Sequence, residues 1–252
     1  MILKGNGVSP GFAAGNIYIH EKITIEVRES FCAAGEEQAQ AGRYEEIKKQ
    51  AALELEQIIL KTEKLDPDKA GIFRAHQDIL DDVVINEEIP GKILNKHWSG
   101  EWAVYKAYET FIKMMQKVPD PLIAERAADF EDVRGRLLRL WRGIKEKSLD
   151  DLKEKVIVAA RELWPSDTVT MDKDKVLAIL TEKGGVTSHS AIIAKSYGIP
   201  AVLGIPGLLE AVKQGQMAAV NALEGTVVLD PDRALAEEYA QKRIAFYSQK
   251  GI

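Results

Sequence analysis

The chain has 252 residues, of which 46% are apolar and 29% are charged, a composition typical of soluble globular proteins. The net charge of −5 gives no sign of a nucleic-acid partner, and the single cysteine, Cys32, excludes an internal disulfide and a cysteine metal site. Neither a signal-peptide run nor a membrane-spanning run is present. We therefore expect a cytoplasmic protein with no membrane partner.

The first part of the chain changes from extended to helical patterns. Alternating polar and apolar residues at 16–20 and 23–27 predict two strands. From about residue 33 to 147 the apolar period is helical, and Pro67 is suited to the first position of a second helix. Breaks are expected at Pro90, at Ser99 and around Pro119. Four or five helices with short connections indicate a bundle.

After Asp150 the pattern changes again. Short apolar runs at 156–160, 176–180, 201–204, 217–222 and 226–230 alternate with turns, as do the buried strands of an α/β layer. Residues 232–252 form a charged amphipathic helix that ends without a cap, so we expect this chain to be the front part of a longer protein.

The predicted fold class is therefore α/β plus all-α. Residues 1–30 and 148–231 form a discontinuous α/β domain, because the N-terminal strands are expected to join the later sheet. Residues 31–147 form an inserted helical domain of the four-helix type. Residues 232–252 form a linker helix.

The segment GGVTSHSAII, residues 184–193, carries the most informative histidine of the chain. It follows a predicted buried strand, and Thr187 or Ser188 is suited to cap a helix that ends at Gly198. His189 then lies in the first turn, where unpaired N–H groups and the helix dipole favour anions and a neutral, nucleophilic imidazole. The glycines allow backbone to approach phosphate oxygens closely. The context favours phosphate chemistry.

Other interpretations of His189 remain. A histidine at a helix start is more often a solvated polar residue or a backbone hydrogen-bond partner. A metal site has little support, since His20, His76 and His97 have no ligand spacing with His189. A serine nucleophile has none either, because no G-x-S-x-G motif is present.

Longer stretches carry a family resemblance. The segment GGVTSHSAIIAKSYGIPAVLG resembles the phosphohistidine segment of the phosphoenolpyruvate-utilising family. Further stretches resemble enzyme I of the bacterial sugar phosphotransferase system, namely GVSPGFAAG at the N-terminus, IFRAHQDILDD at 72–82, ERAADFEDVRGRLL at 125–138 and PSDT at 165–168. They occur in the family's order over nearly the whole chain.

This resemblance implies a mechanism and a swivelling phosphohistidine domain. His189 would accept the phosphoryl group of phosphoenolpyruvate and pass it to a histidine of the phosphocarrier HPr. Thr168 would orient the imidazole, although a local cap after Pro165 is the plainer interpretation of this threonine. The phosphate environment would be formed by Gly184, Gly185, Thr187 and Ser188.

The inserted helices would then be the docking platform for HPr or a paralogue. The resemblance assigns docking to Phe73, His76, Asp82 and Arg126. From spacing alone, Phe73 and Leu80 read as core, and His76 and Asp82 read as a solvated face. Core remains an interpretation of Leu80 even with the resemblance.

Two departures from the family bear on phosphate binding and on the carrier. Val186 stands where enzyme I proteins commonly have arginine, so one cation for the phosphate is missing there. The docking helix carries Pro67, Arg74 and Asp78 in place of a more acidic and apolar surface. A carrier of a nitrogen-related or dihydroxyacetone-kinase branch is therefore an alternative to the sugar-system HPr.

The resemblance also implies what lies outside this chain. The phosphoenolpyruvate and Mg²⁺ sites and the dimer interface belong to a C-terminal barrel, so we expect no cofactor here, a monomer, and no autophosphorylation. Two rival functions remain: a swivelling domain of a phosphoenolpyruvate synthase or pyruvate phosphate dikinase, and a non-catalytic regulatory module that binds a phosphocarrier.

Overall fold

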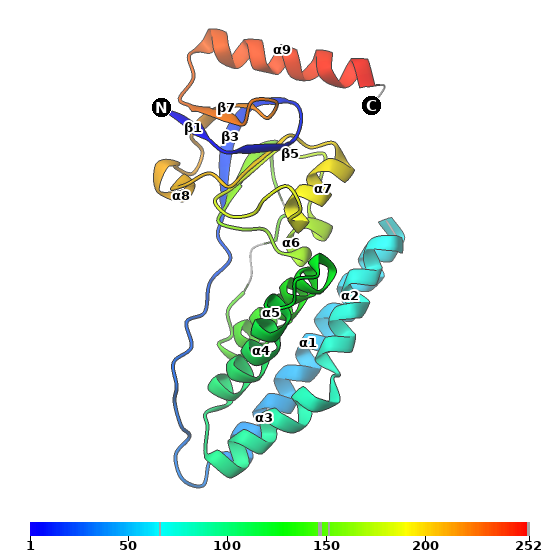
Figure 1. Cartoon of the computed structure of the whole chain (residues 1–252), viewed down its shortest axis with the longest axis vertical. Helices are drawn as coiled ribbons and strands as arrows, with labels where there is room; N and C mark the ends of the chain where they lie inside the picture. The colour runs from blue at the N-terminus through cyan, green and yellow to red at the C-terminus, as the bar shows by residue number, and fades with distance from the viewer. Residues whose placement is uncertain (66, 146–147, 151, 251–252) are drawn as a thin grey trace. The chain divides into compact units, whose positions relative to one another are not determined.

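The computed structural model describes residues 1–65, 67–145, 148–150 and 152–250. Within helices it leaves out the side chains of Leu65, Asp68, Lys69, Ala124, Glu125, Val169, Thr170, His189, Gln249 and Lys250. The chain divides into two compact units, Met1–Lys22 with Lys147–Ile252 and Ile23–Glu146. The helical unit thus begins earlier than the predicted residue 31, and the predicted boundary at 147 lies outside the described residues. Figure 1 labels the helices of both units and some of the strands of the first.

Among the described residues of the first unit, eight strands form one mixed sheet in the order β1-β8-β7-β3-β4-β5-β6-β2. Their bounds are β1 Ile2–Lys4, β2 Asn6–Ser9, β3 Phe12–His20, β4 Val156–Ala160, β5 Val176–Thr181, β6 Ala201–Leu203, β7 Met217–Asn221 and β8 Thr226–Leu229. Strands β3 to β6 are parallel, and the helical unit is inserted in the chain between β3 and β4. The five apolar runs predicted as buried strands are confirmed as β4 to β8.

Each face of this sheet carries its own apolar core. The helices of the unit are α6 Pro165–Thr170, α7 His189–Tyr197, α8 Leu208–Ala211 and α9 Arg233–Lys250. Because side chains alternate along a strand, Val158 of β4 packs with Ala191 of α7, whereas its neighbour Ile157 packs in the core that holds Leu208 of α8. Helices α7 and α8 therefore cover opposite faces.

The terminal helix α9 packs on its own unit. It contacts β3 and β7, and Arg243 Nη1 donates to the carbonyl oxygen of Leu177 at 2.7 Å. The hydroxyl of Tyr247 donates to the carbonyl oxygen of Gly198 at 2.6 Å. The sequence pattern predicts a separate linker helix over residues 232–252. In the structure the described part of that segment is anchored to the sheet and to the end of α7, while residues 251–252 lie outside the described residues (Figure 1).

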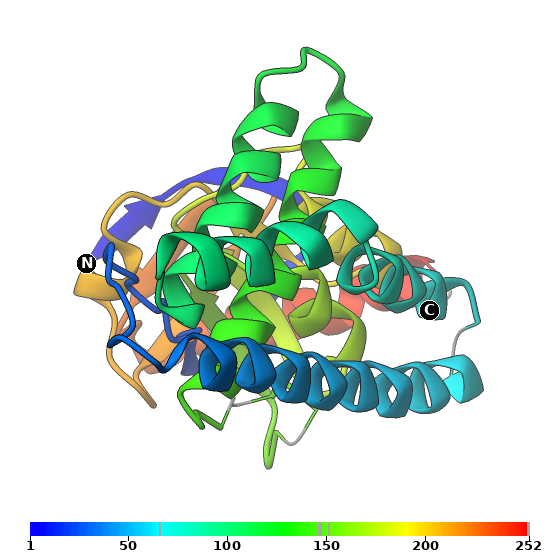
Figure 2. The ribbon, with the colours of Figure 1, turned by 90° about the horizontal axis from the view of Figure 1, so that it is seen from below.

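The helical unit is a bundle of long helices. Their bounds are α1 Glu37–Leu65, α2 Pro67–Leu80, α3 Val83–Lys96, α4 Gly100–Gln116 and α5 Pro121–Trp141. Helix α1 packs along α2 and α3, and α4 runs beside α5, as Figure 2 shows. Ser99 caps α4, since its hydroxyl accepts from the backbone N–H of Trp102 at 3.2 Å, and Pro121 opens α5. The start of α2 at Pro67 and the break at Ser99 are confirmed.

Two local predictions in this unit are wrong. Residues 23–27 form no strand, because a strand needs a hydrogen-bonded neighbour and none of the described strands lies beside them. Pro90 does not end a helix but lies inside α3. An internal proline costs about 3 kcal/mol. Ile85, Ile89 and Ile93 are wholly buried on one face of α3, and burial of each stabilises by about 1.5–3 kcal/mol, which outweighs that cost.

An acid-dependent ion pair stabilises α4. Hydrogen bonding from Lys106, at 2.8 Å, and then from Lys113, at 3.0 Å, lowers the pKa of Glu109 from 4.5 to about 2. Because the pKa of Glu109 is lower in the folded chain than in the unfolded chain, its ionised carboxylate stabilises the fold above pH 4.5. This contribution disappears as the pH falls towards 2. We expect Glu109→Gln to lower the free energy of unfolding by less than about 1 kcal/mol at pH 7. The difference should shrink at pH 3, measured by urea unfolding. An equal difference at both pH values would refute the assignment.

Candidate active site at the carboxyl edge of the parallel strands

The candidate site lies where the parallel strands end. His20 closes β3, and it is in register with Ala160 at the end of β4, which in turn pairs with Thr181 at the end of β5. The chain then passes from β4 into α6 and from β5 into α7. In open α/β sheets, ligands bind outside the carboxyl ends of such strands. The topology therefore brings the PSDT and GGVTSH segments to one edge.

Helix α7 begins at His189, as predicted. Ser188 is its N-cap: the hydroxyl accepts from the backbone N–H of Ala191 at 3.3 Å and donates to the carbonyl oxygen of Gly185 at 2.8 Å. Gly198 ends the helix in the left-handed conformation at φ +64°, which confirms that prediction. The backbone of His189 thus opens a capped helix, while its side chain lies outside the described part of the structure.

The loop before α7 combines one strained glycine with exposed neighbours. Gly184 has φ +99°, and a Cβ there would lie 3.2 Å from the hydroxyl oxygen of Ser188. A Cβ on Gly185 would meet no atom within 4 Å. Thr187 and Val186 are exposed, and the Nζ of Lys195 donates to the carbonyl oxygen of Val186 at 3.5 Å. An ammonium group therefore lies beside the loop. Lys195 is not among the residues predicted from the sequence, where its position six residues after His189 is the only signal.

Thr168 lies in α6, which contacts α7. Its side chain is wholly buried, and its hydroxyl donates to the carbonyl oxygen of Pro165 at 2.9 Å, as expected for a local cap. The hydroxyl of Ser190 reaches the carbonyl oxygen of Leu163 at 3.5 Å and so ties the first turn of α7 to the chain just before α6. The structure thus brings the two helices carrying Thr168 and His189 together. Ser190, also missed from sequence, lies at their junction.

The predicted docking residues divide into buried and accessible ones. Phe73 and His76 on α2 are wholly buried, their ring centroids are 5.7 Å apart, and His76 Nε2 lies 3.1 Å from Asp129 Oδ1 on α5. Buried side chains cannot contact a partner protein, so the docking role predicted for Phe73 and His76 is corrected to one of packing. The alternative of a solvated face for His76 is wrong for the same reason. Leu80 is core, and Arg126 is exposed.

Asp82 is a helix cap. Its Oδ1 accepts from the backbone N–H of Ile85 at 3.0 Å at the start of α3. We expect Asp82→Ala to lower the free energy of unfolding by about 1 kcal/mol, whereas Asp82→Asn keeps the capping oxygen and most of the stability. Urea unfolding of the two variants measures this difference. Equal losses would contradict the capping role, and weaker carrier binding by Asp82→Asn would reveal a docking role of its charge.

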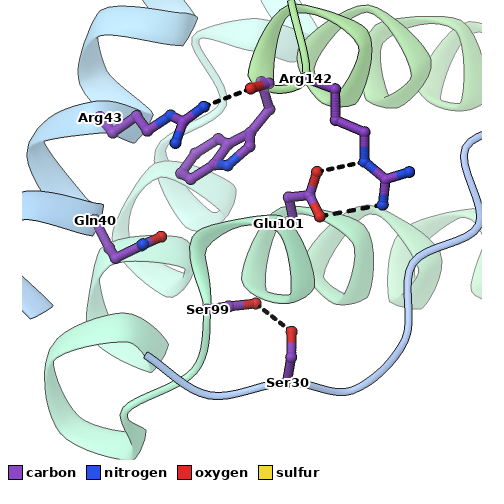
Figure 3. Close-up of a pocket in the computed structure, with 7 residues that line it drawn as sticks. Ser30, Gln40, Arg43, Ser99, Glu101 and Arg142 are labelled. Atoms are coloured by element: carbon purple, nitrogen blue, oxygen red, sulfur yellow. Dashed lines mark hydrogen bonds and ion pairs between the residues drawn. The ribbon is translucent and has the colours of Figure 1, made fainter. Parts of the chain in front are cut away.

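A shallow pocket in the helical unit holds none of the predicted residues. It is lined by Ser30, Gln40, Arg43, Ser99, Glu101, Trp141 and Arg142 (Figure 3). Arg142 makes a forked pair with Glu101, with N–O distances of 2.7 and 3.2 Å, and Arg43 donates to the carbonyl oxygen of Trp141 at 2.6 Å. Because both guanidinium groups already have partners, the pocket offers no evident anion site.

Among the residues that the structure describes, no three histidine, cysteine, aspartate or glutamate side chains are grouped as metal ligands. No helix in that part of the chain combines the length and apolar character that crossing a membrane requires.

Comparisons with known proteins agree with the observed fold. The family profile described as PEP-utilising enzyme, N-terminal, matches residues 4–126, and the one described as PEP-utilising enzyme, mobile domain, matches residues 152–225. A solution structure of enzyme I is 34% identical, with a TM-score of 0.84, and the match covers 97% of this chain and 99% of that one. The chain belongs to the phosphoenolpyruvate-utilising enzyme family.

Relatives within the phosphoenolpyruvate-utilising family place the resemblance more closely. Proteins named phosphoenolpyruvate-protein phosphotransferase from Bacillus sp. strain S and Bacillus subtilis strain 168 are 34% and 33% identical over 98% of this chain. The chain spans 43% of their length. The N-terminal domain of a nitrogen enzyme I, 21% identical with a TM-score of 0.56, shares the fold alone. The resemblance to enzyme I is thus confirmed, and α6 and α7 both fall in the family's mobile domain.

Proposed function

We propose that this chain is the phosphotransfer part of a phosphoenolpyruvate-protein phosphotransferase. His189 accepts a phosphoryl group and exchanges it with a histidine of a phosphocarrier, HPr or a paralogue. In the whole protein the phosphoryl group comes from phosphoenolpyruvate, which is bound by a C-terminal barrel that also holds Mg²⁺. The whole protein acts in the cytoplasm. Relatives named for this reaction, 34% identical over 98% of the chain, support the proposal.

The observation that carries the proposal is the start of α7 at His189. A capped helix begins there directly after the glycine loop, at the carboxyl edge of the parallel strands. Its first backbone N–H groups lack partners within the helix, and the dipole supports an anion by about 0.3–1 kcal/mol. Lys195 adds a cation near Val186, where the family commonly has arginine. This modest attraction suits a phosphoryl group that must leave again.

The proposed chemistry is a reversible exchange between two imidazoles. A lone pair of one His189 ring nitrogen forms the new P–N bond while the P–N bond to the carrier histidine breaks, and the electron pair of the broken bond stays on the carrier nitrogen. Thr168, buried on the adjoining helix α6, orients the imidazole so that the attacking nitrogen faces the phosphorus. Gly184, Gly185, Thr187 and Ser188 form the loop around the transferred group.

The helical unit is proposed as the docking platform for the carrier. Arg126 is exposed on α5, and Asp82 lies at the start of α3, so both remain candidates for contacts. Phe73 and His76 would contribute only by supporting α2. Arg126→Glu should therefore weaken carrier binding, whereas a packing residue would act through stability.

The test is exchange with a phosphorylated carrier. The chain is incubated with phosphorylated HPr, and phosphohistidine on each protein is followed by phosphorus NMR. The reaction is then run in reverse, from the phosphorylated chain to unphosphorylated HPr. Acid-labile phosphate should appear on the chain and return to the carrier. Binding of several carriers without any transfer would favour the regulatory module, and neither binding nor transfer would refute the proposal.

A further inference from the structure

A buried histidine–carboxylate pair joins the end of β3 to α6. His20 is 2% exposed and Asp167 is 5% exposed, and His20 Nε2 lies 3.0 Å from Asp167 Oδ1. The second oxygen of the same carboxylate, Oδ2, accepts from the backbone N–H of Trp164 at 2.9 Å. One side chain therefore bridges the edge of the sheet and the first turn of the helix that carries Thr168.

Helix α6 depends on such external support. It spans six residues, and a helix this short is not stable by itself. Trp164, at its N-cap, has no side-chain oxygen to cap the helix, and the Asp167 carboxylate supplies the other half of a capping box by accepting from the Trp164 N–H. A shift of Asp167 would rotate or fray this single turn. Thr168 is the next residue in the turn and would move with it.

Lys22 makes a second connection from the same end of β3. Its Nζ donates to the hydroxyl of Ser166 at 3.3 Å and lies 5.3 Å from the centre of the Trp164 ring. His20 at the end of β3 thus contacts Asp167, and Lys22 just after the strand contacts Ser166. The two contacts hold consecutive residues of the α6 turn. Thr168 itself is wholly buried in that turn.

The energetics favour a specific role for this pair. A carboxylate that loses a partner in a buried site costs about 1–3 kcal/mol or more. The Nδ1 atom of His20 is buried without a hydrogen-bond partner among the described residues, so Nε2 makes the one resolved polar contact of this ring. An apolar side chain of similar size would avoid that orphaned atom. The chain nevertheless keeps a histidine, and its one contact is to Asp167.

We propose that His20 and Asp167 are positioning residues for phosphoryl transfer, acting through Thr168. His20 holds the Asp167 carboxylate, the carboxylate holds the first turn of α6, and that turn fixes the hydroxyl that orients the His189 imidazole. The inference rests on the proposed function of Thr168 and His189. It adds to the site two residues that lie 147 positions apart in the chain.

The test compares His20→Phe, which keeps a ring but removes the donor, with His20→Gln, whose amide places a donor near the position of Nε2. With phosphorylated HPr as donor, His20→Phe should lower the rate constant kcat for transfer by about tenfold to a hundredfold, the range found for hydrogen-bond partners that orient metal-binding histidines. The KM for HPr should stay within about twofold, since the carrier does not touch His20. His20→Gln should restore most of the rate. A His20→Phe rate within twofold of the wild type would overturn the proposal.

A double-mutant cycle identifies the route of the effect. If His20 acts through Thr168, adding His20→Phe to Thr168→Val should cost little beyond Thr168→Val alone. Full additivity would show that the two act separately and would overturn the proposal. Should His20→Phe fail to fold by far-UV circular dichroism, Asp167→Asn is used in the same cycle, because it keeps the shape and removes the charge.

A measurement on the unphosphorylated protein separates this inference from the proposed function. Nitrogen-15 NMR of labelled histidines reports the tautomer ratio of the His189 imidazole without any transfer. His20→Phe should shift that ratio towards the one in Thr168→Val, even if no carrier phosphorylates the chain. An unchanged ratio would overturn the positioning role, whereas absent transfer with a shifted ratio would refute only the proposed function.

Discussion

His189→Ala is expected to take up no phosphoryl group from phosphorylated HPr, a loss of at least a thousandfold against the wild type. In the proposed transfer the imidazole nitrogen forms the new P–N bond, and no other group in the capped turn at the start of α7 can replace it as a nucleophile of this kind. Carrier binding should persist, since docking is proposed for the helical unit. Single-turnover transfer and calorimetric binding measure the two properties separately.

The matched control for this variant is His97→Ala. His97 is an exposed histidine of the helical unit, and its Nδ1 lies 2.8 Å from Glu37 Oε1. Its removal should leave transfer unchanged within about twofold, because surface ion pairs contribute little. Phosphorylation of His189→Ala, or loss of phosphorylation in His97→Ala with the fold intact, would be incompatible with His189 as the proposed acceptor.

Gly184→Ala is expected to impair both stability and transfer. Gly184 has φ +99°, which is unfavourable for a residue with a Cβ, and that Cβ would lie 3.2 Å from the Ser188 hydroxyl oxygen. The strain costs about 1–3 kcal/mol. Displacing Ser188 also disturbs the cap that starts α7, and a shift of about 1 Å at the reacting atoms can slow a reaction a hundredfold. We therefore expect a lower urea midpoint and at least tenfold slower transfer.

Gly185→Ala serves as the control for stability. A methyl group at this position would meet no atom within 4 Å, and its φ lies outside the left-handed range. It should unfold at nearly the wild-type urea concentration. If the two alanine variants lost the same stability, the conformation of Gly184 would not be the cause. Slow transfer in Gly185→Ala at full stability would indicate that its backbone approaches the phosphate closely.

The strands and the ends of α7 could be predicted because they depend on local patterns. Continuous apolar runs mark strands covered on both faces, and Gly198 followed by Pro200 marks a helix end wherever it occurs. The helix break predicted at Pro90 is wrong because burial of the three isoleucines of α3 stabilises the helix by more than the internal proline costs. That burial is visible only in the packed bundle.

The partners of single polar residues could not be predicted in this way. The sequence near His76 gives no sign that this histidine is buried and paired with Asp129 on another helix. The pairing of His20 with Asp167 likewise depends on the parallel register of β3 and β4. Family resemblance located the segments that are proposed to carry the chemistry. Only the topology indicates which distant side chains support them.

The most direct test of the account is to identify the phosphorylated atom. The chain has four histidines, so a sample labelled with nitrogen-15 histidine gives a small set of imidazole signals. After reaction with phosphorylated HPr, phosphorus–nitrogen coupling should appear on one ring, and His189→Ala should assign that ring to His189. Coupling on His20, His76 or His97, or a chain that stays unphosphorylated while HPr is bound, would contradict the central claim.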